Sequence, residues 1–352
     1  MNINLKVWEI SENDFPSNGT LFEKFKFFIN YAILAPSGHN TQPWLFKIND
    51  DNIEVIADRT RALPVIDPDD KELIISCGAA IENMSIAMKY FGFKPEIFLM
   101  PDSGDNDLLA RVKITIGYTP TEEEKKFFKA ITKRRTNRRP FAEQMIDEIL
   151  LNDFENLAMK EHTNFVIIKD EDTKKEILKL IEKGDRIQCE NKSFCRELAQ
   201  WIHPNRTNSK DGIPGYAYGM NDLLSYAQPF FIGNLEWGSI QAGRDRNLVK
   251  GSPLLTVLEC NEDNQTDWLY TGMSLTEILL KACSEGIAAS YLNQPIEVNE
   301  LNLEIRKLLG LKGIPQLIFR MGYGKEVKPT PRRKVEEVIL NFTENNADEE
   351  EE

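Results

Sequence analysis

The stretch GAAIENMSIAMKYFG, residues 78–92, begins and ends with glycine, and the later stretch GMSLTEILLKACSEG, residues 272–286, repeats that spacing. Both patterns predict helices that stop at the second glycine, because glycine commonly ends a helix. Each helix is followed by an extended segment and then by a strand that ends in Gly-Tyr, at 117–118 and at 322–323. This repeated order predicts two related halves in one chain. The alternative is that glycine merely stops two unrelated helices.

The segments around these helices predict the fold class. The runs WLFKI, residues 44–48, and IEVIAD, residues 53–58, flank the turn-forming stretch NDDN and predict a β-hairpin after a helix over 21–34. Further helices are predicted over residues 121–133, 143–159 and 172–201. Because hairpins and helices are mixed without regular β-α-β alternation, we expect an α+β fold with antiparallel-rich sheets flanked by helices.

The domain limits follow from the same pattern. We expect a first half over residues 1–120 and a second half over residues 121–343. An irregular, lid-like insertion rich in Gly, Pro and Tyr is expected at 203–243, and long irregular segments often form lids or binding loops. Aromatic side chains in and beside it could stack on a bound ring or fill an apolar crevice: Trp201, Tyr216 and Tyr218. The acidic tail, residues 344–352, is expected to be disordered and solvated.

Composition excludes several classes of function. The formal net charge of −13 opposes binding of nucleic acid or of an anionic membrane surface. No apolar run is long enough to span a membrane, and the five scattered cysteines form neither a zinc motif nor a disulfide framework. We therefore expect a cytoplasmic protein without a metal site. Hydrolase and Rossmann-fold motifs are absent from the sequence as well.

Two kinds of motif point to a bound anion and a flat ring. The stretch AILAPSGHNTQPWLF crowds Pro36, Ser37, Asn40 and Gln42 into a turn between a helix and a strand, where small polar side chains and amides suit a heterocycle or a phosphate. The stretches RRTNRRPF, residues 134–141, and PTPRRK, residues 329–334, are basic clusters in an acidic protein. Guanidinium groups suit a phosphate monoester. A tight structural turn and solvated basic faces are the alternatives.

The order of these motifs resembles the nitroreductase-like family of FMN-dependent oxidoreductases, and most of all its tandem single-chain, Acg-like branch. The resemblance covers about residues 20–340 and includes the runs ASYLNQPIE and IFRMGYG. It implies a nitroreductase-like fold duplicated in one chain as an intramolecular pseudo-dimer. The first-half helix lacks an Arg-rich opening, so the resemblance implies one FMN per chain.

The resemblance also implies which residues hold the flavin. Arginines and a threonine of the second half would bind the phosphate and ribityl chain: Arg134, Arg135, Thr136, Arg138, Arg332 and Arg333. Residues of the first half would cross over to the isoalloxazine ring: Pro36, Ser37, Asn40 and Gln42. Asn293 and Gln294 would lie near flavin N5. No catalytic side chain is required, because the flavin itself carries the hydride.

Two functions are compatible with this site. The first is an enzyme that passes hydride from NADH or NADPH through FMN to a nitroaromatic, a quinone or a similar small acceptor. The second is a protein that sequesters or stores FMN beneath a lid and turns over little. In either case the expected partners are small molecules, and the chain would act as a monomeric pseudo-dimer or as a homodimer.

Overall fold

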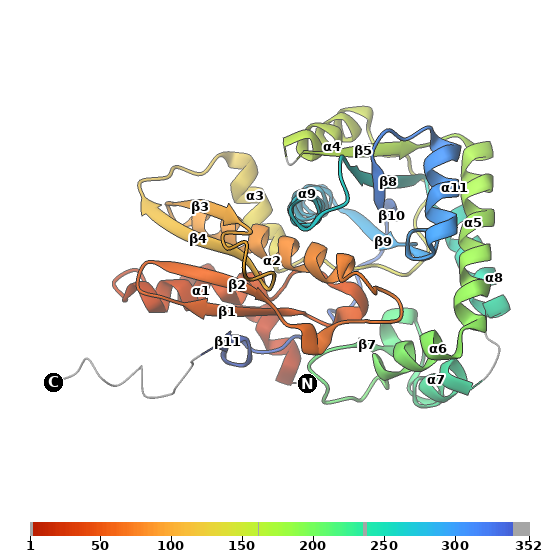
Figure 1. Ribbon diagram of the computed structural model, residues 1–352, viewed down its shortest axis with the longest axis horizontal. Coiled ribbons are helices and arrows are strands. Elements are labelled where there is room, and N and C mark those ends of the chain that lie inside the picture. Colours follow the sequence, from red (N-terminus) through yellow and green to blue (C-terminus); the bar gives the residue numbers. More distant parts are fainter. Residues whose placement is uncertain (1–2, 161, 235–237, 341–352) are drawn as a thin grey trace.

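The computed structural model describes residues 3–160, 162–234 and 238–340, and the expected acidic tail at 344–352 lies outside the described residues. Two antiparallel-rich sheets are flanked by helices (Figure 1), which confirms the α+β class. The first sheet has the strand order β11-β1-β2-β4-β3. Its strands are β1 (Trp44–Ile48), β2 (Asn52–Ala57), β3 (Phe93–Leu99), β4 (Leu108–Ile116) and β11 (Ile339–Leu340). The expected hairpin is present as β1 and β2, which pair in antiparallel fashion.

The second sheet repeats the strand order of the first. It runs β5-β8-β10-β9, and each neighbouring pair is antiparallel, as in β1-β2-β4-β3. Its strands are β5 (Thr163–Ile168), β8 (Leu254–Cys260), β9 (Ile287–Tyr291) and β10 (Ile314–Tyr323). After β10 the chain returns to the first sheet, where β11 pairs parallel to β1. The C-terminal segment therefore joins the two sheets.

The two glycine-bracketed helices lie together between the sheets (Figure 1). They are α2 (Lys71–Tyr90) and α9 (Gln265–Ser284), each of 20 residues, and Gly78 and Gly272 are the eighth residue of their helices. A Cβ atom on Gly272 would overlap the α2 backbone, with the amide nitrogen of Ala79 only 2.7 Å away. The helix backbones therefore touch at these glycines. Gly92 and Gly286 follow the two helices with φ of 85° and 75°, a conformation that glycine adopts readily.

Other helices follow the sequence signals closely. Thr20 and Glu23 form a capping box at the start of α1 (Leu21–Ala32), and Thr121 and Glu124 do so at α3 (Glu122–Ile131). Helix α4 (Glu148–Lys160) precedes β5. The helix predicted over 172–201 is two helices, α5 (Glu171–Glu190) and α6 (Lys192–Gln200). Asn191 separates them, because its extended backbone ends α5 and its side chain caps the first amides of α6.

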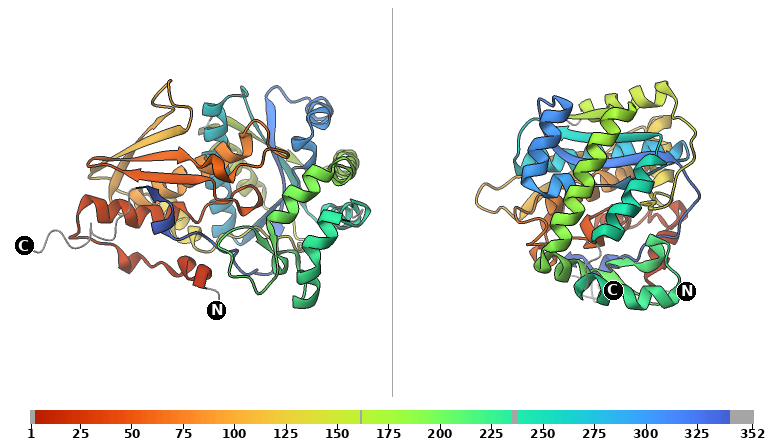
Figure 2. Two further views of the ribbon diagram at one scale, coloured as in Figure 1. Left: turned by 60° about the horizontal axis from the view of Figure 1, so that its bottom comes forward. Right: turned by 90° about the vertical axis from the view of Figure 1, so that its right-hand side faces the viewer.

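The chain between β5 and β8, residues 169–253, crosses one end of the molecule, and we call this segment the excursion. It contains α5, α6, β6 (Ile202–His203), β7 (Ile213–Pro214), α7 (Asp222–Asn234) and α8 (Gly238–Lys250). The segment predicted to be irregular at 203–243 is therefore largely helical after residue 221, and Pro229 lies inside α7. Helices α10 (Gln294–Glu297) and α11 (Asn299–Leu309) connect β9 to β10. Figure 2 (right) shows α5, α8 and α11 side by side over the second sheet.

The main hydrophobic core surrounds α2 and α9 and extends to both sheets. Helix α2 is buried along nearly its whole length, and its buried apolar side chains include Ile74, Ile81 and Met84. Two smaller clusters lie between α5 and the second sheet and beneath α6. No helix among the described residues is long and apolar enough to cross a membrane.

Candidate functional site

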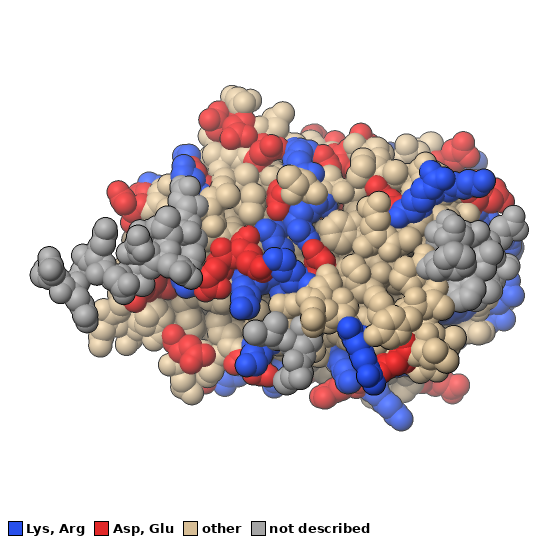
Figure 3. All heavy atoms as spheres, turned by 90° about the horizontal axis from the view of Figure 1, so that it is seen from below, with Lys and Arg blue, Asp and Glu red and all other residues tan. Residues whose placement is uncertain are grey.

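A cleft of about 1730 Å³ opens where the two halves of the chain meet. It is lined by the turn after α1, the start of α2, the segment after α3, parts of the excursion, the start of α10 and the chain after β10. Ligand pockets commonly measure about 300 to 1,000 Å³, so this cleft has room for more than one small molecule. Figure 3 shows lysine and arginine side chains gathered in the middle of the face seen from below.

The turn after α1 lies on one side of the cleft and has an unusual backbone. His39, Asn40 and Gln42 have φ of 48°, 59° and 56°, a region that non-glycine residues rarely occupy. The Ser37 hydroxyl accepts a hydrogen bond from the amide of Gln42 at 2.9 Å and closes the turn. Such strain persists only where the surroundings hold it, and it is concentrated at functional sites. Pro36, Ser37 and Asn40 all line the cleft.

Asn40 connects this turn to the C-terminal arginines. Its side-chain oxygen accepts a hydrogen bond from Arg332 Nη1 at 2.5 Å, and its amide nitrogen donates to the carbonyls of Gly212 and Pro331. Arg134 lines the same cleft and donates to the Leu34 carbonyl, just before the turn. The structure therefore brings the turn after α1 together with Arg134 and Arg332.

Arg134 and Arg332 are buried cations without an acidic partner. Their exposed fractions are 6% and 3%, and no ion pair to a carboxylate involves either one in the described part of the chain. Arg332 donates only to neutral oxygens, those of Asn40, Thr330, Pro331 and Ala35, and its Nε has no partner. Burial lowers the pKa of Arg134 and lowers the pKa of Arg332 well below its usual range. Both guanidinium groups thus lack the anion that a buried charge needs.

Arg135 and Thr136 line the same cleft as Arg134 and Arg332. Arg135 lies flat over the Trp8 ring, 3.9 Å from its centre, and burial lowers its pKa to about 10. The Arg332 guanidinium also lies near the Trp8 ring, 4.9 Å from its centre. Thr136 lines the cleft and forms a parallel β-bridge with Ala289 of β9.

Arg320 binds the backbone of the arginine-rich segment 134–141. The sequence did not identify it as a candidate site residue. It lies on β10, is fully buried, and donates from Nη2 to the carbonyls of Asn137 and Arg139 at 3.0 and 2.8 Å. Its guanidinium also stacks 4.0 Å from the centre of the Phe141 ring. Only the arginine within the otherwise apolar strand run IFRMGY could have signalled this role.

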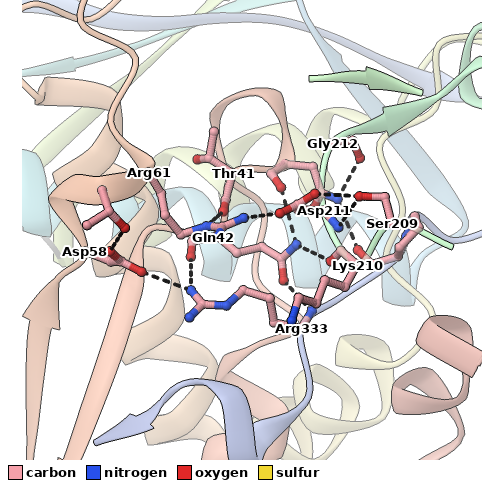
Figure 4. A network of polar contacts seen from close by, with 12 residues as sticks. Thr41, Gln42, Asp58, Arg61, Ser209, Lys210, Asp211, Gly212 and Arg333 are labelled. Atoms are coloured by element: carbon pink, nitrogen blue, oxygen red, sulfur yellow. Dashed lines mark hydrogen bonds and ion pairs between the residues drawn. The ribbon is translucent and has the colours of Figure 1, made fainter. Parts of the chain in front are cut away.

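Gln42 and Arg333 do not line the cleft. The amide of Arg333 donates to the Gln42 side-chain oxygen at 2.8 Å, and its guanidinium pairs with Asp58 at 3.2 Å (Figure 4). Gln42 Nε2 donates to the Lys210 carbonyl, so the two residues join the first sheet, the excursion and the C-terminal segment. Arg61 binds Asp211 within the same network. Gln42 and Arg333 therefore lie outside the cleft lining and connect these three parts of the chain.

Arg138 lines the cleft beside an aromatic residue of the excursion. Its guanidinium stands 5.2 Å from the centre of the Tyr218 ring, and Arg244 approaches that ring to 4.9 Å. The Tyr216 hydroxyl donates to the Pro329 carbonyl at 2.7 Å and fastens the excursion to the C-terminal segment. Trp201 does not line the cleft and lies beneath Arg61 instead.

Asn293 and Gln294 line the cleft at the start of α10. Asn293 accepts a hydrogen bond from the Ile318 amide and donates to Glu72 at 3.1 Å. Gln294 donates from Nε2 to both Asp185 and Asp245. The neighbouring Tyr291 hydroxyl is buried without a hydrogen-bond partner.

The sequence did not identify the acidic residues that line the cleft. Glu72, Asp185 and Glu297 line the cleft from three different helices. Burial raises the pKa of Glu297 to about 7 and of Asp185 to about 8, and it also raises that of Glu72. No group of His, Cys, Asp and Glu in the described ranges is arranged to hold a metal ion. These acids are dispersed in the sequence, so no motif marked them.

Comparison with known proteins gives curated relatives over most of the chain. The chain is 25% identical to "Putative NAD(P)H nitroreductase Rv3131" of Mycobacterium tuberculosis over 88% of its length and 89% of the relative. It is equally identical to the "Putative NAD(P)H nitroreductase acg" of that organism, over 88% of this chain and 93% of the relative. "Probable NAD(P)H nitroreductase PigM" of Serratia sp. is 22% identical over 92% of this chain and 94% of the relative. The resemblance to Acg-like proteins is thereby confirmed.

Two further comparisons add little. No protein-family model matches the chain. A nitroreductase with bound FMN from Desulfitobacterium hafniense is 16% identical over 62% of this chain and 98% of its own, with a TM-score of 0.37. A likeness this weak does not support an argument about the fold.

Proposed function

We propose that this chain is an FMN-dependent oxidoreductase that uses NADH or NADPH to reduce a small electrophilic acceptor, such as a nitroaromatic compound or a quinone. One observation carries the proposal: two buried arginines without acidic partners share a cleft with a strained, amide-rich turn from the other half of the chain. The curated relatives named as NAD(P)H nitroreductases support it.

The basic end of the cleft fits a phosphate monoester. Arg134 and Arg332 are buried, unpaired with any carboxylate in the described residues, and line one cavity with Arg135 and Thr136. A dianionic phosphate would supply the missing counter-charge, and its oxygens could accept charge-assisted hydrogen bonds. The unpartnered Nε of Arg332 is one donor available for this purpose.

The rest of the cleft fits a flat, polar ring. The turn formed by Pro36, Ser37 and Asn40 lines the cleft together with Asn293 and Tyr291, and the Tyr291 hydroxyl has no hydrogen-bond partner among the described residues. When bound, FMN would supply two-electron transfer between nicotinamide and acceptor. The protein would place both molecules against the ring, and Arg138, which lines the cleft, would stabilise negative charge there.

We also infer that the chain arose as a duplicated nitroreductase-like unit that folds into an intramolecular pseudo-dimer. The matching strand orders, the two 20-residue helices and their crossing glycines support this inference. The halves proposed are residues 1–120 and 121–343. The arginine motif RRTNRRPF occurs in the second half only, so we propose one FMN per chain. Cytoplasmic location and the choice between monomer and homodimer stay predictions.

The fastened excursion supports a second candidate function, in which the protein stores FMN. Asn40 and Gln42 donate hydrogen bonds to carbonyls of residues 210–212, and Tyr216 donates to the C-terminal segment. An excursion held at three points would restrict entry of a nicotinamide. Storage therefore predicts bound flavin that reacts slowly with NADH and NADPH.

Anaerobic spectroscopy of the purified protein tests both functions. The enzyme should be yellow, should bleach on addition of NADH or NADPH, and should regain its colour with a nitroaromatic or quinone. A yellow protein that resists bleaching by both nucleotides, but bleaches with dithionite, would support storage. A protein that neither purifies with flavin nor binds added FMN would refute both.

A further inference from the structure

Three acidic side chains from three helices form one wall of the cleft. Glu72 on α2, Asp185 on α5 and Glu297 on α10 line the cavity, and we name them the carboxyl wall. Burial and the nearby charge of Glu297 raise the pKa of Glu72, so these two carboxyl groups are close neighbours. Asp185 is joined to Asp245 on α8 by Gln294, whose Nε2 donates to both carboxylates at 3.0 and 2.8 Å. The wall therefore contains one close acid pair and one carboxylate that is bridged by an amide to a further acid.

These acids form no ion pair with a base in the described residues, although Arg244 and Arg320 lie near enough to Asp245 to offset part of the rise in its pKa that burial causes. In the described part of the chain, no ion pair links a lysine or arginine to Glu72, Asp185, Asp245 or Glu297. Two carboxyl groups as close as those of Glu72 and Glu297 cannot both ionise easily, so this pair tends to share a proton. The shared proton leaves one negative charge on the pair. The wall is thus the electrostatic opposite of the arginine end.

One oxygen of the wall is buried and unsatisfied. Asp185 is only 2% exposed, and its Oδ2 has no hydrogen-bond partner, although Oδ1 accepts from Gln294. The Gln294 side-chain oxygen beside it is also unpartnered. Leaving a buried carboxylate oxygen without a donor costs free energy. Both oxygens need a hydrogen-bond donor that the described residues do not supply.

The wall borders the space proposed for the flavin ring. Glu72 accepts a hydrogen bond from Asn293, and its Oε2 lies against Gly38 of the strained turn, where an added Cβ would be 2.8 Å away. The arginines that suit a phosphate line the same cleft, which is larger than one ligand needs. A second molecule stacked on the ring could therefore reach the wall.

We infer that the carboxyl wall is the acceptor subsite and that it selects an aromatic acceptor bearing a protonated amine. An ammonium group has three donors, which suit the unsatisfied oxygens of Asp185 and Gln294, and its charge compensates the negative charge of the wall. The role of the ligand as acceptor rests on the proposed function. Recognition of the ammonium rests on the carboxyl wall alone.

Binding of the cation should depend on pH, because the ammonium replaces a shared proton. The Glu297 carboxyl, with its pKa raised to about 7 by burial, must ionise to pair with the ligand. Affinity for the cation therefore rises as pH increases through neutrality, and affinity for a neutral analogue does not. Other charged groups face the acids of the wall: Asp67, Glu182, Asp245, Arg244 and Arg320.

The test compares two probes that differ in one group, para-nitrobenzylammonium and para-nitrobenzyl alcohol. Calorimetry on the purified full-length protein measures their dissociation constants. We expect the ammonium probe to bind about tenfold more tightly, equivalent to about 1.4 kcal/mol. The double variant Asp185→Asn/Glu297→Gln should bind the two probes equally. The control variant Glu300→Gln removes an exposed acid on α11 and should keep the preference.

Equal affinities in the unmodified protein, or a preference that survives the double variant, would overturn the inference. Flavin absorbance of the same samples separates the two proposals. A protein that retains flavin but shows no preference for the cation refutes the carboxyl wall alone. A protein that binds no flavin but prefers the cation refutes the oxidoreductase proposal, and the wall then remains a cation site.

Discussion

Replacing Arg134 by methionine should weaken FMN binding without weakening the fold of the flavin-free protein. Arg134 is 6% exposed, and its one side-chain hydrogen bond, to the Leu34 carbonyl, is long at 3.3 Å. Loss of such a bond costs about 0.5 to 1.5 kcal/mol, whereas an uncompensated buried charge costs several kcal/mol. Methionine fills similar space without the charge. We therefore expect the flavin-free variant to be more stable by about 1 kcal/mol or more.

The matched control is Arg333→Met in the same protein. Arg333 is equally buried, but it pairs with Asp58 at 3.2 Å and lies behind the turn rather than in the cleft. Breaking a buried ion pair from one side costs about 3 to 5 kcal/mol, because the remaining carboxylate loses its partner. The two substitutions thus have opposite expected effects on stability although the chemical change is identical.

Urea unfolding of flavin-free protein and fluorescence titration with FMN are the assays. Loss of charge-assisted hydrogen bonds to a phosphate should raise the FMN dissociation constant of Arg134→Met by about 10- to 100-fold, or 1.5 to 3 kcal/mol. Arg333→Met should destabilise the protein in urea. An Arg134→Met protein that is less stable by 2 kcal/mol or more and binds FMN normally would refute the reasoning.

Three further outcomes are expected. Gly272→Leu should prevent α2 and α9 from touching and should abolish soluble expression or lower the midpoint of thermal unfolding by more than 10 °C, with Gly243→Leu as a control in open space. Arg320→Met should leave two loop carbonyls unpaired and should weaken FMN binding measured by titration; unchanged affinity would remove its positioning role. The raised pKa values of Glu297 and Asp185 mean that the folded state holds protons that the unfolded state releases, so stability should fall as pH rises from about 4.5 to 8. Urea midpoints across that range measure the fall, and the Asp185→Asn/Glu297→Gln variant should flatten it.

The sequence predicts the local elements of this fold well where the signals are local. The capping signature at Thr121 marks the start of α3 within one residue, and the glycine spacing identifies the two central helices. The break at Asn191 and the helical part of the excursion were not predicted. A single asparagine cap gives little signal inside a long amphipathic pattern, and Pro229 argues against a helix that packing nevertheless maintains.

The sequence predicted only part of the site, because short motifs identify only residues that are close together along the chain. Short motifs identified Asn40, Arg134 and Arg332, which the fold brings to one cleft. Arg333 follows Arg332 directly in sequence, but alternation along an extended segment turns it to the opposite side, toward Asp58. The carboxyl wall comes from three helices separated by more than one hundred residues, so only the fold reveals it.

The flavin content of the reconstituted protein tests the central claim most directly. Purified protein is saturated with FMN, freed of excess, and assayed for flavin and polypeptide after denaturation. Our account predicts one FMN per chain for the unmodified protein and a clear loss of retained flavin in Arg134→Met. Two flavins per chain, or none, would contradict it.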